Sequence, residues 1–375
     1  MILRSLLAHL SQQTDFKKAI IILGPRQAGK TTLVKSLAVA LGDGFTYVNG
    51  DEPMARSLWK PEQVQTVIQI IGKNRLVIID EAQALENIGL LVKILIDREL
   101  GYQFIITGSS ALELANQTFE SLTGRYMGYK LLPVSIQELR NTYGLMPVIE
   151  NLPQRLIFGS YPEVIGYPEN AKGVISTLTQ SYLYKDILAL TGLRKPQVLD
   201  DLLKALSWQV GSQVSYNELS RTLGIDVKTV DKYITILEKN FILFTLPSFA
   251  RNLRNELLRS KKIYFYDNGI RNSVINNFSP LAYRADVGAL WENYLISERI
   301  KWLINNNIQA NTYFWRTTSQ SEIDFIEETN GNIKAYEFKY NPKGKARFAQ
   351  SFIESYNPLE LKVIHSENYW EWLSA

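Results

Sequence analysis

Two carboxylates near the end of the chain are spaced so that a hairpin would bring them face to face. The sequence EIDFIEETNGNIKAYEFKY, residues 322–340, is typical of two short strands joined by the turn dipeptide Asn330-Gly331. A two-residue turn at that point sets Asp324 opposite Glu337. Two carboxylates directly opposed across a ladder repel each other, so sheet packing alone does not favour the pair. A divalent cation between them would remove the repulsion.

The order of charged side chains in this region resembles the PD-(D/E)xK nuclease fold. A predicted helix carries Glu292, the hairpin carries Asp324, and Glu337 and Lys339 form the Glu-x-Lys pattern. The resemblance implies that Glu292, Asp324 and Glu337 bind Mg²⁺ or Mn²⁺. Lys339 would then position or activate water against a phosphodiester. The alternative is an ordinary charged strand face, in which Glu322 and Lys339 lie opposite each other and form a cross-strand salt bridge.

A phosphate-binding pattern stands near the beginning of the chain. The sequence GPRQAGKT, residues 24–31, matches the full P-loop pattern; an apolar run over residues 19–23 predicts a buried parallel strand before it, and a helix-forming stretch follows. Glycines let backbone amides turn toward phosphates, and the new helix adds its positive N-terminal end. We therefore expect an ATP site in which Lys30 reaches the β- and γ-phosphates and Thr31 binds Mg²⁺. The predicted nucleotide-binding residues are Gly24, Pro25, Arg26, Gln27, Ala28, Gly29, Lys30, Thr31 and Thr32.

Acidic and hydroxyl side chains follow the next two apolar runs. Residues 76–79 predict a strand that ends in Asp80 and Glu81. We expect Asp80 to hold Mg²⁺ through its waters and Glu81 to orient or activate the attacking water, which favours ATP hydrolysis over small-molecule kinase or GTPase chemistry. A third strand in YQFIITGSS would bring Thr107, Ser109 and Ser110 to the same sheet edge. Ligands bind at this edge in open α/β sheets, at the carboxyl ends of the strands. A hydroxyl there can contact the γ-phosphate or the water.

Arg125, in the sequence FESLTGRYMGYK, is a candidate arginine finger. Such a residue reaches the γ-phosphate from the same subunit or from a neighbouring one, and the second case would imply a homo-oligomer. The alternative is a surface arginine that pairs with an acid. Arg98 is a weaker candidate for the same role.

Several of these phrases together resemble the AAA-type ATPases of bacteria and archaea that carry a conserved uncharacterised C-terminal region. The phrases are GPRQAGKTT, IIDEAQ, ITGSS and LTGRY, followed by GSYPEV, YLYKDI, KIYFYDNGIR and YFWRTTSQSEIDF. The resemblance covers nearly the whole chain. It implies an α/β P-loop NTPase domain with a parallel sheet over residues 1–150, a helical lid and winged helix over residues 151–255, and a mixed α/β nuclease-like domain over residues 256–375.

The sequence in the middle of the chain is typical of a helix-turn-helix. Ser215 and Glu218 form a capping-box pattern, Gly224 ends the first helix, and a second helix is predicted over residues 227–239. A strand is expected over residues 241–246.

That second helix could contact DNA. Lys228, Thr229 and Lys232 would then project into a major groove, but Asp231 on the same exposed stretch would repel phosphates. The alternative is a plain packing module beside an ATPase lid. The basic run over residues 251–262 is a further candidate for phosphate contact, although such runs are usually solvated faces.

Composition narrows the function classes. The 375 residues suggest two or three domains, and 46% hydrophobic residues are typical of a globular protein. The net charge of +4 permits a nucleic-acid partner without requiring one. The absence of cysteine excludes disulfides and thiolate metal sites, and two histidines make an all-histidine zinc site improbable. With no apolar run of about 20 residues, we expect a cytoplasmic protein without a membrane partner.

The sequence therefore predicts an ATP-binding, Mg²⁺-dependent ATPase whose nucleotide state controls a nuclease-like C-terminal domain acting on DNA. One alternative is a nucleotide-dependent switch whose C-terminal region binds a protein or DNA partner without cleavage. Another is a free-standing ATPase whose other domains mediate assembly.

Overall fold

The structure is a computed structural model that describes residues 2–11, 18–42, 44–108, 121–181, 196–249, 261–317 and 321–374. It separates into two compact units, which we call the first and the second unit. The first comprises Met1–Pro133 and Lys239–Phe241, and the second comprises Val134–Glu238 and Ile242–Ala375. The three-domain division at residues 150 and 255 stays a prediction. In the part of the chain that is described, each helix is too short or too polar to span a bilayer.

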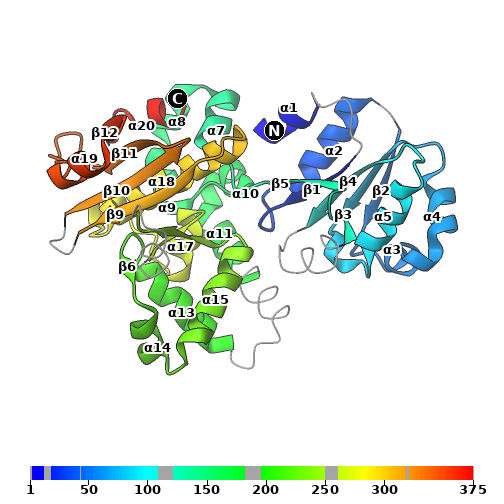
Figure 1. Cartoon of the computed structure of the whole chain (residues 1–375), viewed down its shortest axis with the longest axis horizontal. Coiled ribbons are helices and arrows are strands. Elements are labelled where there is room, and N and C mark those ends of the chain that lie inside the picture. The colour runs from blue at the N-terminus through cyan, green and yellow to red at the C-terminus, as the bar shows by residue number, and fades with distance from the viewer. Residues whose placement is uncertain are drawn as a thin grey trace. The chain divides into compact units, whose positions relative to one another are not determined.

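The first unit is built on a five-stranded sheet with the strand order β2-β3-β4-β1-β5 (Figure 1). Each neighbouring pair of strands is parallel. The apolar run that predicted the first strand forms β1 at the predicted residues, and it lies between β4 and β5. This parallel sheet is that of a P-loop NTPase and confirms the predicted α/β fold class. The strands are β1 (Ala19–Leu23), β2 (Phe45–Asn49), β3 (Leu76–Asp80), β4 (Gln103–Gly108) and β5 (Tyr126–Lys130).

Helices cover both faces of this sheet. On one face, α1 and α2 place Leu10 and Leu37 in a core with Ile20 and Ile22. On the other face, α4 and α5 pack in a second core with Ile21. Successive isoleucines of β1 therefore enter opposite cores, as the alternation of side chains along a strand requires. The helices are α1 (Ser5–Ser11), α2 (Lys30–Leu41), α3 (Pro53–Leu58), α4 (Val64–Ile71) and α5 (Ile88–Asp97).

The second unit begins with a run of short helices. A capping box starts α7, because the Ser135 side chain accepts from the Glu138 backbone while the Glu138 carboxylate accepts from the Ser135 backbone. Pro162 begins α10 and Pro168 begins a short 3-10 helix, so the two prolines divide the helical region into short helices. The helices are α7 (Ile136–Tyr143), α8 (Leu145–Glu150), α9 (Leu152–Phe158), α10 (Pro162–Gly166) and α11 (Ala171–Gln180).

Three helices and a three-stranded sheet follow. The Ser215 side chain caps α14 by accepting from the Glu218 backbone, and Gly224, with a left-handed φ of 63°, ends it. The predicted second helix is confirmed as α15 at the predicted residues, with Val230, Ile234 and Leu237 buried. The strand order is β6-β8-β7. The elements are α13 (Pro196–Trp208), β6 (Gln213–Val214), α14 (Tyr216–Leu223), α15 (Val227–Lys239), β7 (Leu243–Pro247) and β8 (Lys261–Phe265).

The predicted hairpin is part of a four-stranded mixed sheet with the order β12-β11-β10-β9. Its turn has left-handed φ angles of 51° at Asn330 and 82° at Gly331, and the observed pairs, such as Phe325 with Tyr336, have the predicted register. This separate sheet confirms a mixed α/β region near the end of the chain. The elements are α17 (Asn268–Val274), α18 (Val287–Asn305), β9 (Asn311–Arg316), β10 (Glu322–Thr329), β11 (Asn332–Phe338), α19 (Gln350–Tyr356), β12 (Glu360–Ile364) and α20 (Tyr369–Trp372).

Candidate functional site

The P-loop connects the end of β1 to the start of α2. Gln27 and Gly29 have left-handed φ angles of 57° and 93°, which turn the backbone sharply before Lys30 begins the helix. The Lys30 side chain is buried, and its Nζ donates to the carbonyl oxygens of Gly24 and Pro25, each at 2.9 Å. The lysine thus lies along the loop that the sequence predicts to bind phosphates.

Gly24 is required by a close approach between two strands. A Cβ atom at this position would lie 2.0 Å from the carbonyl oxygen of Leu131, far inside van der Waals contact. The approach is fixed because the Leu131 backbone N–H donates to the Leu23 carbonyl at 2.8 Å. Any side chain at position 24 would therefore displace the start of the loop.

Three hydroxyl groups surround the Asp80 carboxylate. Thr31 and Tyr47 each donate to Oδ2 at 2.7 Å, and Thr107 donates to Oδ1. Burial and the hydrogen bond to Asp80 raise the pKa of Tyr47, so this phenol is a neutral donor at physiological pH. The sequence placed Thr31, Asp80 and Thr107 together but missed Tyr47, because the strand that carries it, β2, was not predicted.

The Thr31 and Asp80 side chains fit a Mg²⁺ site. Both offer oxygen ligands, which this hard cation prefers. They come from the start of α2 and the end of β3, and their contact joins residues that are 49 positions apart in the chain. The two elements therefore bring the predicted pair together.

Glu81 follows Asp80 in a left-handed backbone conformation, with φ of 49°. Its carboxylate accepts a hydrogen bond from the Gln83 side chain, and its backbone N–H donates to Thr107 Oγ1 at 3.4 Å. The turn carries Glu81 away from the strand direction at the carboxyl edge of the sheet. Ser109 and Ser110, the other predicted hydroxyls of this edge, lie outside the described residues.

Arg125 pairs with an acid. Its Nε donates to Asp97 Oδ1 at 2.6 Å and its Nη2 donates to Oδ2 at 3.3 Å, with both side chains about 40% exposed. This contact corresponds to the surface-pair alternative, and the role of Arg125 as an arginine finger stays a prediction.

The second unit gathers the four residues of the nuclease-like pattern. Burial raises the pKa of Asp324 well above its ordinary value, and the neighbouring carboxylates of Glu292 and Glu337 raise it further. Burial also raises the pKa of Glu337, against the opposing effect of Lys339, whose Nζ donates to Glu337 at 3.2 Å. The helix glutamate and the two hairpin acids are thus electrostatic neighbours. We call Glu292, Glu322, Asp324 and Glu337 the acid cluster.

Lys262 neutralises part of the acid cluster. This buried lysine of β8 donates to Glu292 at 3.0 Å and also forms an ion pair with Glu322. Burial alone would lower the pKa of Lys262, but the carboxylates of Glu292, Glu322 and Asp324 outweigh that effect and raise it. Tyr264, on the same face of β8, donates to Glu292 at 2.6 Å. The prediction of Lys262 as part of a basic run for phosphate contact is wrong for this residue, because it is buried and paired with Glu292 and Glu322. Tyr264 was missed; the signal for both was a lysine at the start of the apolar strand sequence KIYFY.

The predicted pairing of Glu322 with Lys339 is wrong. Strand β11 ends at Phe338, and the Lys339 backbone N–H donates to Ile364 of β12 instead. Glu322 pairs with Arg316 of β9, in a stretch where the register between β9 and β10 shifts. Because of this irregularity, the ideal two-residue hairpin register does not extend to the end of both strands.

The acid cluster as it stands does not form a metal site. In the described ranges, no group of three or more acidic, histidine or cysteine side chains is placed to hold a metal ion. The carboxylate of Glu292 is already bound by Lys262 and Tyr264, and one Asp324 oxygen accepts the Phe338 backbone N–H at 2.8 Å. The predicted second Mg²⁺ or Mn²⁺ does not fit this arrangement of side chains.

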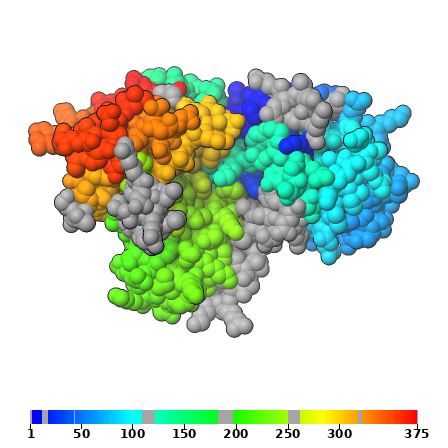
Figure 2. Space-filling view, viewed as in Figure 1, coloured from blue at the N-terminus to red at the C-terminus, as the bar shows by residue number. Residues whose placement is uncertain are grey.

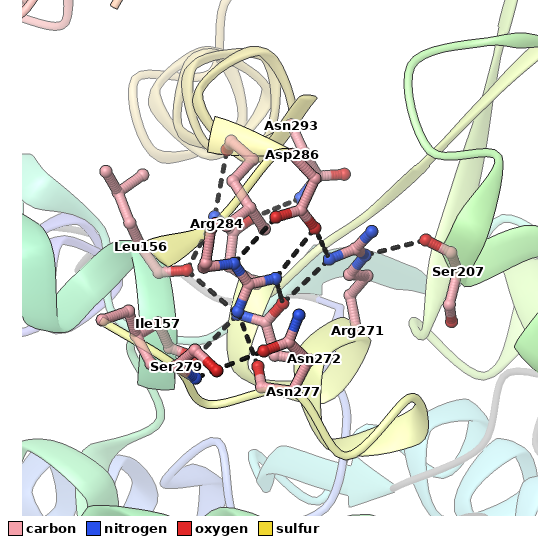
Figure 3. A network of polar contacts seen from close by, with 12 residues as sticks. Leu156, Ile157, Ser207, Arg271, Asn272, Asn277, Ser279, Arg284, Asp286 and Asn293 are labelled. Carbon is pink, nitrogen blue, oxygen red and sulfur yellow. Dashed lines mark hydrogen bonds and ion pairs between the residues drawn. The ribbon is translucent and has the colours of Figure 1, made fainter. Parts of the chain in front are cut away.

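Two arginines fix the start of α18, the helix that carries Glu292 (Figure 3). The Asp286 carboxylate accepts from Arg271 at 2.5 Å and from Arg284 at 2.8 Å, and both arginine side chains are buried. Arg271 also donates to the Ser207 carbonyl of α13 at 2.8 Å. The network therefore ties α13, α17 and α18 together and holds the acid cluster's helix in place.

The exposed face of α15 carries the predicted DNA-contact residues. Lys228 and Lys232 are exposed, and so is Asp231. The Thr229 hydroxyl donates to Asp226 at 2.6 Å, which commits it to the start of the helix. Two of the three predicted contact residues thus remain as exposed cations.

Three family models match separate parts of the chain. Residues 16–140 match a family described as an AAA domain. Residues 149–281 and 287–368 match two families that are each described as a domain of unknown function.

Relatives with similarity along most of the chain are themselves uncharacterized. A Mycobacterium tuberculosis protein is 26% identical over 341 residues, which cover 90% of this chain and 73% of that protein. A Methanocaldococcus jannaschii protein is 22% identical over 372 residues, which cover 93% and 81%.

Among solved structures, the Thermotoga maritima RuvB Holliday junction branch migration motor aligns with 73% of this chain and 92% of its own. The identity is 16% and the TM-score is 0.31, too low to establish a common fold across the aligned region. The match to AAA domains and the parallel sheet with its P-loop together support an AAA-type P-loop ATPase in the first unit.

Proposed function

We propose that the first unit binds ATP on residues 24–32 and hydrolyses it with Mg²⁺. The observation that carries the proposal is the 2.7 Å contact between Thr31 and Asp80, beside the buried Lys30. Thr31 and Asp80 would hold Mg²⁺, which supplies positive charge against the phosphates. Lys30 would exchange its loop carbonyl partners for phosphate oxygens, and Glu81 would orient the attacking water.

ATP hydrolysis by purified protein tests this site. We expect Lys30→Ala and Glu81→Gln each to abolish most of the activity, with Glu81→Gln still binding nucleotide. Lys73→Ala, an exposed lysine after α4, is the matched control. Hydrolysis that survives both site changes would show that the reaction occurs elsewhere.

We propose further that the nucleotide state controls engagement of DNA by the second unit. The proximity of Glu292, Asp324, Glu337 and Lys339 supports a nuclease-like region, and a metal there would have to displace Lys262 and Tyr264 from Glu292. The exposed cations Lys228 and Lys232 offer an additional DNA contact.

A second candidate function is a nucleotide-dependent switch that binds DNA or a protein without cleaving it. The observation that favours it is the internal cation Lys262, which occupies Glu292 and Glu322. A cluster whose charge is already balanced by a lysine is suited to a structural role.

A plasmid-nicking assay with Mg²⁺ or Mn²⁺, with and without ATP, distinguishes the nuclease from the switch. Nicking that disappears in Asp324→Ala and in Glu337→Ala, but persists in Glu328→Ala on the same hairpin, would establish an ATPase-linked nuclease. No nicking by protein that hydrolyses ATP would establish the switch.

A further inference from the structure

A group of exposed cations borders the acid cluster. After Glu337 the chain contains no acidic residue before Glu354, and it carries Lys343, Lys345 and Arg347. These three side chains belong to exposed residues, and none forms an ion pair with a described residue. We call them the basic loop. In Figure 2 the orange-red atoms of this part of the chain stand at the surface.

Local hydrogen bonds give the basic loop a defined shape. The Lys343 backbone N–H donates to Asn341 Oδ1, and the Gly344 N–H donates to the Asn341 carbonyl, each at 2.9 Å. A Cβ atom on Gly344 would lie 3.2 Å from Cβ of Lys339, so the turn folds back onto the stem of that lysine. On its other side, Phe348 packs against the core of the four-stranded sheet. The loop is therefore anchored at both ends, with Lys339 beneath it.

Because the basic loop is anchored in this way, its positive charges lie next to the acid cluster, whose carboxylates would otherwise repel an anion. The acid cluster contributes four carboxylates, and its internal cation, Lys262, is buried with only 2% of its side chain exposed. A polyanion that approaches Glu337 and Lys339 needs exposed cations at the border, and the basic loop supplies three. Mobile lysine and arginine side chains bind the phosphates of nucleic acids without reading sequence.

We infer that Lys343, Lys345 and Arg347 form a surface that binds the phosphate backbone of nucleic acid beside the acid cluster. The inference rests on the proposed DNA engagement by the second unit and names the surface that makes it. It does not require cleavage.

The test is binding of a fluorescent 20-base-pair DNA duplex to the full chain, without divalent metal, over a series of salt concentrations. The triple variant Lys343→Gln/Lys345→Gln/Arg347→Gln should bind at least about tenfold more weakly at low salt. Its log–log salt slope should be smaller by about 2 to 3, because about 0.9 counterion is released for each phosphate contact. Retained ATP hydrolysis and tryptophan fluorescence would show that the variant is folded.

The control is Arg140→Gln/Lys172→Gln/Lys334→Gln, which removes the same charge from α7, α11 and β11 of the second unit and leaves the basic loop intact. Equal weakening by this control, or unchanged binding by the loop variant, would overturn the inference. Polyglutamate that competes as well as duplex DNA would overturn it in favour of an acidic polypeptide. Loop-dependent binding without nicking would leave the inference standing and remove only the cleavage proposal.

Discussion

Asp80 in the first unit and Glu292 in the second each lie at the centre of a polar cluster, but their hydrogen-bond donors differ in charge. Asp80 accepts from Thr31, Tyr47 and Thr107, which are all neutral hydroxyls. Glu292 accepts from Tyr264 and from the ammonium group of Lys262. Asp80 accepts at both carboxylate oxygens, whereas both donors to Glu292 reach the same oxygen, Oε1.

The charge of the hydrogen-bond donors determines whether each carboxylate can still bind a cation. Neutral donors lower the cost of burying Asp80 but leave its negative charge, so that charge remains available for an incoming cation. In the second unit the cation is part of the fold, and removing it would leave the partly buried carboxylates of Glu292 and Glu322 without a counter-charge. The first arrangement suits binding of a metal ion, and the second suits a stable framework.

The largest effect should come from breaking the built-in ion pair. We expect Lys262→Met to lower the free energy of unfolding of the second unit by about 3 kcal/mol, because Glu292 and Glu322 lose their buried partner. Urea unfolding followed by tryptophan fluorescence measures this, since of the seven tryptophans only Trp59 lies in the first unit.

Two further variants sharpen that experiment. Adding Glu292→Gln to Lys262→Met should restore part of the stability, because the glutamine needs no counter-charge. Lys334→Ala removes an exposed partner of Glu360 at 3.6 Å and should cost no more than about 1 kcal/mol. A loss that is equally small for Lys262→Met would show that the internal cation is not needed to balance the acids.

A substitution at the P-loop of the first unit should change the rate of ATP hydrolysis and not the stability of the second unit. We expect Lys30→Ala to reduce the rate of ATP hydrolysis about 100-fold, as for loss of a donor that stabilises charge in a transition state. The stability of the second unit should not change. Steady-state phosphate release, with Lys73→Ala alongside, measures the effect; comparable rates in both variants would contradict the assignment.

Asp286 is a third carboxylate to compare with Asp80 and Glu292, and its hydrogen-bond donors are two guanidinium groups. Burial would raise its pKa, but the hydrogen bonds from Arg284 and Arg271 outweigh it and lower the pKa to about 2. Because the folded pKa lies below the unfolded value, this contribution is fully present above about pH 4 and is lost as the pH falls toward 2. At about 1.4 kcal/mol per pKa unit it amounts to about 2 kcal/mol.

The matching measurement is urea unfolding of the wild type and Asp286→Asn from pH 7 down to pH 2.5. The stability difference between the two proteins should shrink as the pH falls from 4. Glu360→Gln, in an exposed pair, is the control. A difference that stays constant over this range would contradict the assigned ionisation.

The smallest effect concerns one neutral donor to Asp80. Thr107→Val removes the hydroxyl that reaches Oδ1, and we expect a loss of about 1 kcal/mol in the stability of the first unit. Thermal unfolding of the first unit with and without ATP measures it. Thr66→Val, which removes an exposed hydrogen bond to Gln63 at the start of α4, is the matched control. A loss above about 3 kcal/mol would mean that the hydroxyls balance Asp80 as strongly as a cation does.

Local sequence patterns were enough to predict the elements around both sites. The apolar run before GPRQAGKT predicted β1, and Asn330-Gly331 predicted the hairpin and most of its register. In each case the residues that predict the element are part of that element or next to it in the sequence.

Contacts between distant segments could not be predicted in the same way. Tyr47 meets Asp80 across 33 residues, and Lys262 meets Glu292 across 30. Nothing next to Lys262 in the sequence distinguishes a buried counter-ion from a surface lysine. The pairing of Glu322 with Lys339 was wrong for a related reason, since the shift in β9–β10 register depends on a third strand.

The contact between Gly24 and the Leu131 carbonyl has a consequence for genetics. A chain with a side chain at position 24 could not hold its loop against Leu131, the residue after β5, and we expect cellular proteolysis to remove it, so the allele would be recessive and resemble a deletion. A Lys30→Ala chain would fold, accumulate and compete with the normal protein for its partners. Two alleles six codons apart should therefore differ in dominance.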